Sequence, residues 1–390
     1  MKRPPLRVLT AAWPSPEEPR RARFLEDLHR QVSDRWATEV LVPRIYSDDP
    51  SVEERAGMSI TRFPTLSSRG PVRSRRIGLF EKATYVLSMD QAARQRWPRD
   101  GAGAGEGCVL AHWIVPAGAI AAGVARRLSV PLVLYAHGSD VNRYALSGLG
   151  RRALRHALSA ASLVFAASEA LRAKLLPELP EENPPRVAVL PMGIDPCFEP
   201  AEEPPAGPNP LRVLFVGDPI ASKGARRVAR AVERCLEEGL SVELTWIGGE
   251  GTYGPPSGVG VRRGNLTAEE VAEEMRRAHR LLLPSDAEGT PLVLQEAIAS
   301  ALPWSATPVG GIPALAEQAP GGTMLPAPSD EAAVVDAIVA QLRQDIAEGD
   351  AGVRRRHAAM VDWPGRRELT VPSRAERFCH ELEGVLRWAS

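Results

Sequence analysis

Two glutamates near residue 290 combine residue types and a spacing that suit the binding of a polar ligand. Glu288 and Glu296 are separated by seven residues within the segment that runs from Leu281 to Gly311. A carboxylate accepts hydrogen bonds from the hydroxyl groups of a sugar or a ribose. The alternative is that Glu288 is a solvated loop residue and that Glu296 pairs with an arginine. The spacing alone does not separate these two interpretations.

The segment around the two glutamates has the pattern of a strand, a loop and a helix. Three leucines and a proline, Leu281 to Pro284, predict a buried parallel strand and its end. A polar loop follows, and Pro291 precedes the apolar stretch LVLQEAIASAL, as prolines do at a first helical turn. In a doubly wound sheet, this loop and the helix N-terminus form a ligand crevice. Exposed amides and the helix dipole favour a phosphate there.

A lysine and a histidine occupy comparable positions after two other predicted strands. Lys223 lies in the loop after the predicted strand 211–216, and His137 follows the predicted strand 132–135. A parallel strand delivers side chains into the crevice at this end, although a histidine there could also be purely structural. Asp140 could accept a hydrogen bond from a sugar hydroxyl on the acceptor side or cap the next helix, the cap being the preferred interpretation.

The segment from Ser285 to Pro313 contains a long ordered motif. It reads Ser-x-x-Glu-Gly-Thr-Pro-x-x-x-x-Glu-Ala, followed by small-Leu-Pro and Val-Gly-Gly-Ile-Pro. This motif resembles the donor site of the retaining glycosyltransferases of family 4. The resemblance covers nearly the whole chain and is strongest from Leu211 to Leu325. It implies the GT-B fold, in which two doubly wound, Rossmann-like α/β domains with parallel sheets face a cleft. The strand–helix alternation in both halves indicates the same α/β class.

The resemblance implies a role for each of these groups. Glu288 contacts the donor sugar and Glu296 holds the ribose of the nucleotide. Lys223 binds the diphosphate, and His137 contacts the donor sugar from the N-terminal domain. His112, in Ala-His-Trp, is a weaker candidate. The backbone expected to approach sugar and phosphate comprises Gly217, Gly289, Thr290, Pro291, Leu292 and Val293.

The loop after the first predicted strand carries the acceptor-side part of the resemblance. Trp13-Pro14 and Phe24 match the family pattern, whereas Ala22 stands where a glycine is usual. Basic side chains in this loop could meet an anionic acceptor such as a phospholipid-linked sugar, and the alternative is a solvated basic loop. These side chains are Arg20, Arg21 and Arg23.

Three positions depart from the family pattern. Asp218 stands where the family carries an arginine beside the diphosphate, and a carboxylate repels that group. Arg226 or Arg227 could replace the missing cation. Ala22 replaces a glycine and Ala314 a glutamate. These departures support an alternative in which the chain is a catalytically weak GT-B protein that acts as a binding or scaffold subunit. A minor third option is another GT-B reaction, such as epimerisation of a nucleotide sugar.

Composition limits the class of protein. The 390 residues suffice for two domains, and a hydrophobic content of 44% argues against global disorder. A formal net charge of zero argues against a nucleic-acid binder. The four cysteines form no CxxC pair, which predicts reduced thiols and no zinc site. No Asp-x-Asp motif is present, so we expect no metal and no cofactor, only a nucleotide diphosphate sugar as co-substrate.

Membrane association is expected to be peripheral at most. The longest apolar run, Ile114 to Ala125, is too short to span a bilayer, and the N-terminus has the pattern of a strand, not of a signal peptide. The segment 67–82 is rich in arginine, with Leu79, Phe80 and Tyr85 nearby. It could lie on an anionic membrane surface, or it could be a solvated helix face. The expected location is the cytoplasm, with contact to the inner face of the membrane as an option.

Four segments make up the expected organisation. Residues 1–200 form the N-terminal, acceptor-side domain, and 201–210 a Pro-rich linker. Residues 211–372 form the donor-binding domain, and the helix 373–390 returns to the N-terminal domain. The expected function is metal-independent transfer, with retention, of a hexosyl group from a nucleotide diphosphate sugar. Polysaccharide, lipid-linked and small-molecule acceptors all remain open.

Overall fold

The chain folds into two compact units in the computed structural model. Unit 1 comprises Met1–Met192 and Val371–Ser390, and unit 2 comprises Gly193–Thr370. The described residues are 3–19, 21–65, 79–101, 103–142, 147–249, 252–256, 260–264 and 266–389. Several arginines of the expected acceptor and membrane contacts lie outside them: Arg20, Arg69, Arg73, Arg75 and Arg76.

Unit 1 contains an eight-stranded sheet with the order β3-β4-β2-β1-β5-β6-β7-β8. Its strands are parallel except for the antiparallel edge pair β3–β4. Central strands such as β6, LVLYA, are buried along their whole length, because helices cover both faces of a parallel sheet. The strands are β1 (Pro5–Leu9), β2 (Ala37–Pro43), β3 (Val52–Arg55), β4 (Met58–Phe63), β5 (Cys108–His112), β6 (Leu132–Ala136), β7 (Leu163–Ala166) and β8 (Arg186–Val189).

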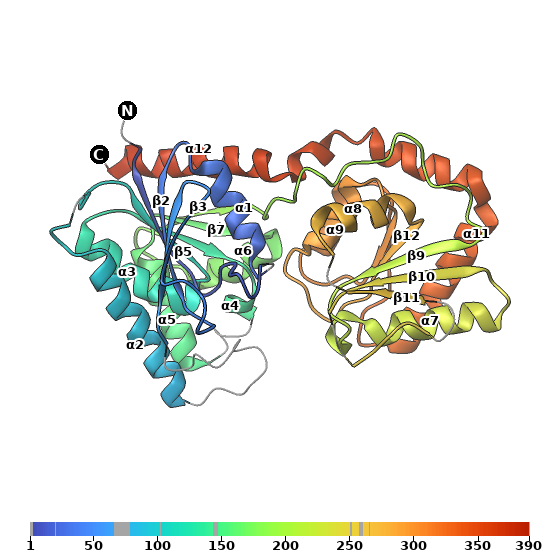
Figure 1. The fold of residues 1–390 in the computed structure, drawn as a ribbon, viewed down its shortest axis with the longest axis horizontal. Coiled ribbons are helices and arrows are strands. Elements are labelled where there is room, and N and C mark those ends of the chain that lie inside the picture. Colours follow the sequence, from blue (N-terminus) through green and yellow to red (C-terminus); the bar gives the residue numbers. More distant parts are fainter. Residues whose placement is uncertain are drawn as a thin grey trace. The chain divides into compact units, whose positions relative to one another are not determined.

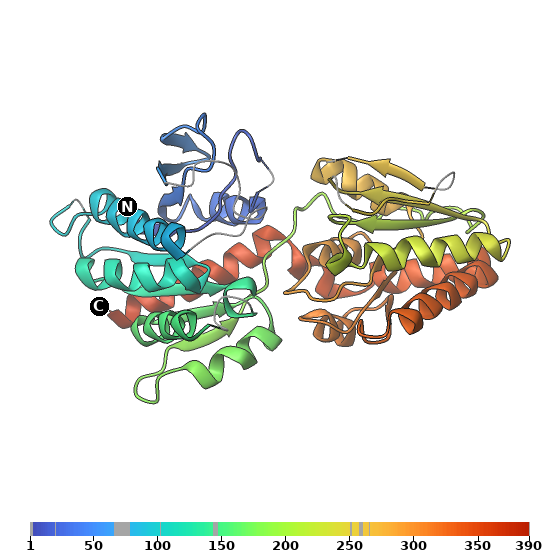
Figure 2. The ribbon, with the colours of Figure 1, turned by 90° about the horizontal axis from the view of Figure 1, so that it is seen from below.

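Helices connect the parallel strands of unit 1 (Figures 1 and 2). The C-terminal helix α12 packs on α1, and its Glu381 accepts a hydrogen bond of 2.8 Å from Arg186 of β8. The helices are α1 (Arg23–Val32), α2 (Leu79–Arg96), α3 (Ala119–Leu128), α4 (Ser139–Asn142), α5 (Gly148–Ala160), α6 (Glu169–Leu175) and α12 (Val371–Ala389), with a π-helical turn η2 (Ile114–Gly118) and a 3-10 turn η4 (Leu176–Glu178).

Unit 2 contains a fully parallel six-stranded sheet with the order β11-β10-β9-β12-β13-β14. Its strands are β9 (Leu211–Val216), β10 (Val242–Ile247), β11 (Gly260–Arg263), β12 (Arg280–Leu283), β13 (Trp304–Ala306) and β14 (Gly322–Met324). Its helices are α7 (Ala225–Glu237), α8 (Ala268–Arg277), α9 (Leu292–Ala299), α10 (Ile312–Gln318) and α11 (Glu331–Val361), with 3-10 turns η5 (Ala221–Lys223) and η6 (Pro364–Leu369).

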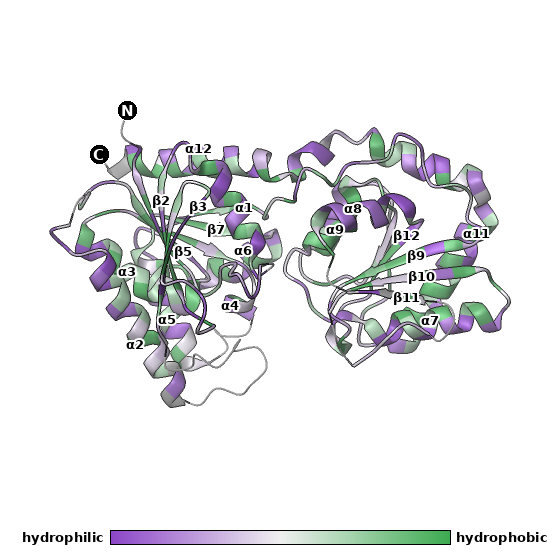
Figure 3. Ribbon diagram, viewed as in Figure 1, coloured by the Kyte–Doolittle hydropathy of each residue, from purple (hydrophilic) through white to green (hydrophobic). Residues whose placement is uncertain are grey.

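Two separate hydrophobic cores lie on the two faces of this second sheet. Alternate residues of β9 enter different cores, because successive side chains of a strand point to opposite faces. Leu214 packs with residues of α8 and α9, whereas Val213 and Phe215 pack with residues of α7 and α11. The helices carry hydrophobic and hydrophilic residues on different sides (Figure 3), as expected for helices that cover a sheet.

The ion pair between Arg280 and Asp345 is buried in unit 2. Arg280 of β12 is 1% exposed, and its guanidinium donates to both carboxylate oxygens of Asp345 on α11, which is fully buried. The same guanidinium also donates to the carbonyl of Trp304 at 3.1 Å and to the hydroxyl of Ser305 at 3.2 Å. This arrangement joins α11 to the centre of the sheet.

The structure differs from the sequence-based expectations at the boundary between the two units. Residues 193–200 belong to unit 2: the amide of Ile194 donates to the carbonyl of Leu369 at 2.9 Å, and Phe198 is buried in the α8–α9 core. The long helix α11 is interrupted at Gly349, whose φ is 59°, so two helical segments meet there. Among the described residues, no helix is long and apolar enough to cross a membrane.

Candidate active site

Close backbone packing brings the loop after β9 against the loop after β12. Gly224 has a left-handed φ of 73°, and a Cβ at this position would lie 2.0 Å from the carbonyl oxygen of Pro284. A side chain there is therefore excluded, and glycine alone adopts this conformation without strain. The amide of Asp286 also donates to the carbonyl of Ser222 at 2.9 Å. These contacts place Lys223 next to the residues that follow β12.

Lys223 and Glu288 form an ion pair at this edge of the sheet. The ammonium lies 2.8 and 3.0 Å from the two carboxylate oxygens of Glu288, and the hydroxyl of Ser285 donates to the same carboxylate at 2.7 Å. The lysine side chain is 35% exposed and the glutamate 8% exposed. The lysine therefore reaches solvent, while the carboxylate is held in one place by two donors.

Gly310 supports the backbone of the loop that carries Glu288. Its φ is 60°, and a Cβ there would lie 2.1 Å from the carbonyl oxygen of Glu288. The next residue, Gly311, donates its amide to the carbonyl of Gly289 at 2.7 Å. Gly310 and Gly311 thus pack directly against the backbone of Glu288 and Gly289. This packing explains why the sequence motif contains both the Glu-Gly and the Gly-Gly dipeptides.

The helix α9 begins directly after this loop. Pro291 occupies its N-cap position, and no side chain caps the helix. Backbone amides at the first turn are orphan donors, and the helix dipole favours a negative charge there. The segment from Gly289 to Val293 therefore presents its backbone beside Lys223 and Glu288. In the neighbouring loop, Gly217 directly follows β9 and has a φ of 154°.

Glu296 lies about one turn into α9 and is half-buried. Burial, together with the nearby carboxylate of Asp195, raises the pKa of its carboxyl to about 7. Among the described residues no arginine or lysine forms an ion pair with Glu296, in contrast to the alternative considered from the sequence. Glu296 therefore has no paired cation among the described residues and lies near an uncapped helix end. Its carboxylate is available to accept hydrogen bonds from hydroxyl groups.

The two arginines that could replace the missing family arginine are engaged elsewhere. Arg227 donates to the carbonyl of Pro284 at 2.7 Å and to the carboxylate of Asp286 at 2.6 Å. Arg226 is exposed and lies 3.3 Å from Glu331. Asp218 is exposed. Lys223 is therefore the cation that the described part of this loop places beside Glu288.

In unit 1, His137 is part of a cluster of aromatic rings at the carboxyl ends of β5 and β6. Its ring stacks on Tyr135, with centroids 4.7 Å apart and planes 8° from parallel. Trp113 lies at 4.7 Å and Phe24 at 5.6 Å. His137 also contacts His112, which contacts His29 of α1. Sequence reasoning missed His29, because no local signal links a helix position to a strand end far along the chain.

The acceptor-side residues are held within unit 1. Trp13 is 3% exposed and lies against the ring of His29. Arg21 pairs with Glu18 at 3.0 Å, and Arg23 with Asp27 at 3.0 Å. Both arginines remain partly exposed.

Asp140 is fully buried, and its carboxylate has a structural position. It accepts hydrogen bonds of 2.9 Å from the amides of Ile114 and Gly138. The first of these holds the turn after Trp113, whose φ of 65° is unusual for a bulky side chain. Ala22, where the family pattern has glycine, also has a left-handed φ, of 52°. The chain thus keeps the glycine-type conformation at a strained non-glycine residue.

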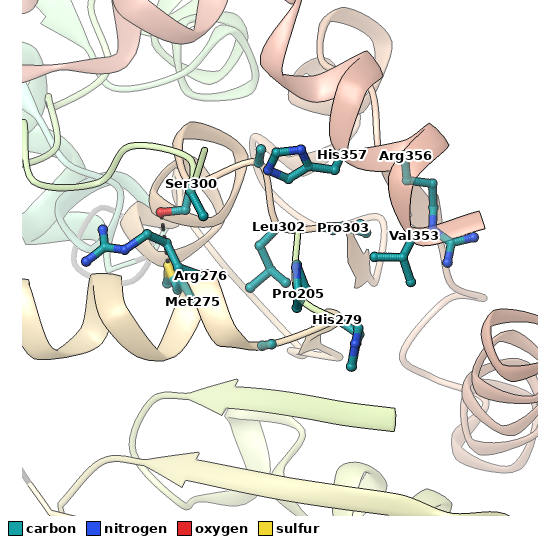
Figure 4. Close-up of a pocket in the computed structure, with 13 residues that line it drawn as sticks. Pro205, Met275, Arg276, His279, Ser300, Leu302, Pro303, Val353, Arg356 and His357 are labelled. Carbon is teal, nitrogen blue, oxygen red and sulfur yellow. Dashed lines mark hydrogen bonds between the residues drawn. The ribbon is translucent and has the colours of Figure 1, made fainter. Parts of the chain in front are cut away.

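Unit 2 contains a cavity (Figure 4), and its lining includes neither Lys223 nor Glu288 nor Glu296. It has a volume of about 20 Å³ and is lined by Met275, His279, Leu302, Val353 and His357, among others. This volume holds roughly one water molecule, so the cavity cannot accommodate a nucleotide. Within the described ranges, no three His, Cys, Asp or Glu side chains are arranged to hold a metal ion.

Comparisons with known proteins identify the family of the chain. Residues 22–198 match the family model Glycosyltransferase Family 4, and residues 210–344 match Glycosyl transferases group 1. A relative from Bacillus subtilis (strain 168), described as the teichuronic acid biosynthesis glycosyltransferase TuaC, is 31% identical over 222 residues. The match covers 53% of this chain and 54% of the relative. The chain therefore spans about half the length of the curated relative it matches.

Solved structures share the fold at low sequence identity. Sucrose-phosphate synthase from Thermosynechococcus elongatus has a TM-score of 0.70 and 17% identity, covering 100% of both chains. HepE from Anabaena in complex with UDP and glucose has a TM-score of 0.67 and 13% identity, covering 97% of this chain and 99% of that chain. With a family 4 domain in residues 22–198 and a group 1 domain in residues 210–344, the chain belongs to the glycosyltransferases and has the GT-B fold.

Proposed function

We propose that the protein transfers a sugar from a nucleotide diphosphate sugar, with retention at the anomeric carbon. The observation that carries this proposal is the cluster of Lys223, Glu288 and Ser285 beside the uncapped N-terminus of α9. In this function Lys223 and the first amides of α9 stabilise the charge that develops on the leaving diphosphate. Glu288 accepts hydrogen bonds from the donor sugar, and Glu296 from the ribose.

The names and bound ligands of similar proteins suggest which donor sugars and acceptors to test first. The HepE structures hold UDP, glucose or UDP-glucose, and a trehalose-6-phosphate protein from Escherichia coli is bound with UDP-2-fluoro glucose. Uridine diphosphate sugars are therefore the first donors to test. The described role of TuaC in teichuronic acid biosynthesis makes a polysaccharide or its lipid-linked precursor the first acceptor. Arg21 and Arg23 would meet the anionic part of a lipid-linked acceptor at a membrane surface, in the cytoplasm.

We further propose that this transfer needs no resident metal ion or other cofactor. The chain has no Asp-x-Asp motif, and Lys223 with the amides of α9 supplies positive charge at the diphosphate. Turnover should therefore persist in the presence of a chelator. A complete loss of turnover on chelation, restored by a divalent cation, would contradict this part of the proposal.

A scaffold function is the second candidate, and Asp218 favours it. This carboxylate stands in the loop that carries Lys223, and Arg226 and Arg227 are both engaged elsewhere. The loop therefore offers less positive charge to a diphosphate than the family pattern. The two functions differ in one measurable respect, since a scaffold requires no release of nucleotide diphosphate from a nucleotide sugar.

Binding of nucleotide sugars should depend on the ionisation of Glu296. Its pKa is raised to about 7, so the carboxylate is the minor form at pH 6 and the major form at pH 8. Because the ionised form is the better acceptor for ribose hydroxyls, affinity should rise about tenfold from pH 6 to pH 8. Calorimetry with uridine, guanosine and adenosine diphosphate sugars measures this, and their phosphodiester groups do not titrate in that range.

Three variants make this measurement specific. Glu296→Gln should bind about tenfold more weakly at pH 8 and lose the pH dependence, and Lys223→Ala should also bind more weakly. Glu317→Gln, on the exposed side of α10, is the matched control and should behave as the parent protein. Absence of binding by all nucleotide sugars would refute the transferase proposal, and a pH dependence that persists in Glu296→Gln would refute the role of Glu296.

A further inference from the structure

Three histidines from separate elements of unit 1 form one continuous hydrogen-bonded chain. His29 lies on α1, His112 is the last residue of β5, and His137 follows β6. Nε2 of His29 lies 2.9 Å from Nε2 of His112, and Nδ1 of His112 lies 2.9 Å from Nε2 of His137. His29 and His112 are fully buried, whereas His137 is partly exposed. The chain therefore leads from the interior to the surface at the carboxyl end of the sheet.

All three imidazoles are neutral at physiological pH. Burial lowers the pKa of His29 and of His137 to about 3, and it lowers the pKa of His112 well below the ordinary value. A neutral imidazole carries one N–H and one lone pair. Each of the two hydrogen bonds requires one N–H, so all the N–H groups must point the same way along the chain. They point either outward, from His29 towards His137, or inward.

The surroundings of His29, at the buried end of the histidine chain, decide between these two directions. Nδ1 of His29 is buried and has no hydrogen-bond partner among the described residues, and the same holds for Nε1 of Trp13, whose ring lies 5.7 Å away. The inward direction would place an N–H on Nδ1 of His29, next to another N–H without an acceptor. A buried N–H without a partner carries its full desolvation penalty. The outward direction leaves only a lone pair there.

The outward direction fixes the protonation of the exposed ring. His112 then donates from Nδ1 to Nε2 of His137, and the remaining proton of His137 lies on its Nδ1. In the described part of the chain, this nitrogen has no hydrogen bond. Stacking on Tyr135 and contact with Trp113 hold the plane of the ring.

We propose that His29 and His112 are positioning residues that fix His137 as the Nδ1–H tautomer, so that His137 donates a hydrogen bond to a substrate oxygen. His137 is then a donor to a hydroxyl group of the donor sugar and does not act as a base. The identity of the substrate rests on the proposed function, whereas the direction of the hydrogen bonds along the three histidines does not.

The tautomers can be observed directly in the ligand-free protein. Long-range proton–nitrogen correlation spectra of protein labelled with ¹⁵N-histidine distinguish Nδ1–H from Nε2–H, and single substitutions assign signals among the seven histidines. We expect Nδ1–H for His137 and His112, and Nε2–H for His29. An Nε2–H form of His137 in the parent protein would overturn the inference.

Two substitutions of the buried residue test the mechanism. Gln at position 29 retains an N–H donor towards His112, whereas Met offers only a weak sulfur acceptor of similar size. His29→Met should reverse the chain, shift His137 to Nε2–H and lower kcat/KM about tenfold. His29→Gln should keep the Nδ1–H form and stay within about threefold of the parent protein. Affinity for the nucleotide diphosphate alone should be unchanged in both.

The outcomes separate this inference from the proposed function. If nucleotide sugars do not bind, the proposed function is wrong, and the parent spectrum still decides the direction of the chain. If His137 keeps the Nδ1–H form in the His29→Met variant, and this variant is as active as His29→Gln, the positioning role is wrong. If His29→Met does not fold, the parent spectrum together with His29→Gln decides.

Discussion

Replacing Lys223 by alanine is expected to lower kcat for sugar transfer about 10³-fold, since preorganised charges aimed at a leaving diphosphate contribute on this scale. Its ammonium is the cation that the described residues place beside Glu288, and the substitution leaves no other cation in that position. The measurement is the release of nucleotide diphosphate from the nucleotide sugar that binds best, with and without a glycan acceptor.

The neighbouring arginine provides a matched control. Arg226→Ala removes a cation three positions along the chain, but that side chain is exposed and pairs with Glu331. It should retain kcat within about twofold, as expected for a surface pair. Lys223→Arg should recover part of the lost activity, because it restores the charge with a different geometry. A Lys223→Ala variant with nearly full kcat would show that the diphosphate is stabilised elsewhere.

The elements that carry the donor-side candidates could be predicted from the sequence because their signals are local. The strand, loop and helix from Leu281 to Ala299 follow one another in the chain, and the order of residue types predicts each element. The pairing of Lys223 with Glu288 is different, because it depends on the close approach of two loops that Gly224 permits. Both residues were predicted as ligand-binding groups, but their mutual contact follows only from the fold.

Residues whose environment depends on packing were harder to predict. Trp13 was expected on the acceptor side, and Asp140 either there or, by preference, as a helix cap. Both are buried, and the carboxylate of Asp140 accepts backbone hydrogen bonds. The sequence contains no signal that His29, on a helix, contacts His112 or that His112 contacts His137. Their contact depends on the register of β5 and β6 and on the position of α1. The roles proposed for these residues therefore need the experiments described above.

Among the substitutions Lys223→Ala, Glu296→Gln and Asp345→Ala, the last should lower the free energy of unfolding of unit 2 the most. Arg280 is 1% exposed, and both of its donor groups that face α11 are bound to Asp345. Asp345→Ala leaves this guanidinium buried without its counter-ion, which costs about 3–5 kcal/mol. The transition of unit 2 should shift down by roughly 10 °C in Tm. Chemical denaturation, followed by the fluorescence of the buried Trp246 and Trp304, measures the free energy of unfolding.

A double substitution separates the lost pair from the lost packing. Arg280→Met with Asp345→Leu removes both charges and keeps most of the apolar volume, so it should be more stable than Asp345→Ala alone, because no uncompensated charge remains buried. Glu238→Ala breaks the exposed pair with Arg343 and should cost less than about 1 kcal/mol. If Asp345→Ala is as mild as Glu238→Ala, the guanidinium of Arg280 must reach another acceptor or water. In that case the sheet and α11 would be held together mainly by their apolar contacts, with polar contacts such as the hydrogen bond of 3.0 Å from the hydroxyl of Thr323 on β14 to Gln341.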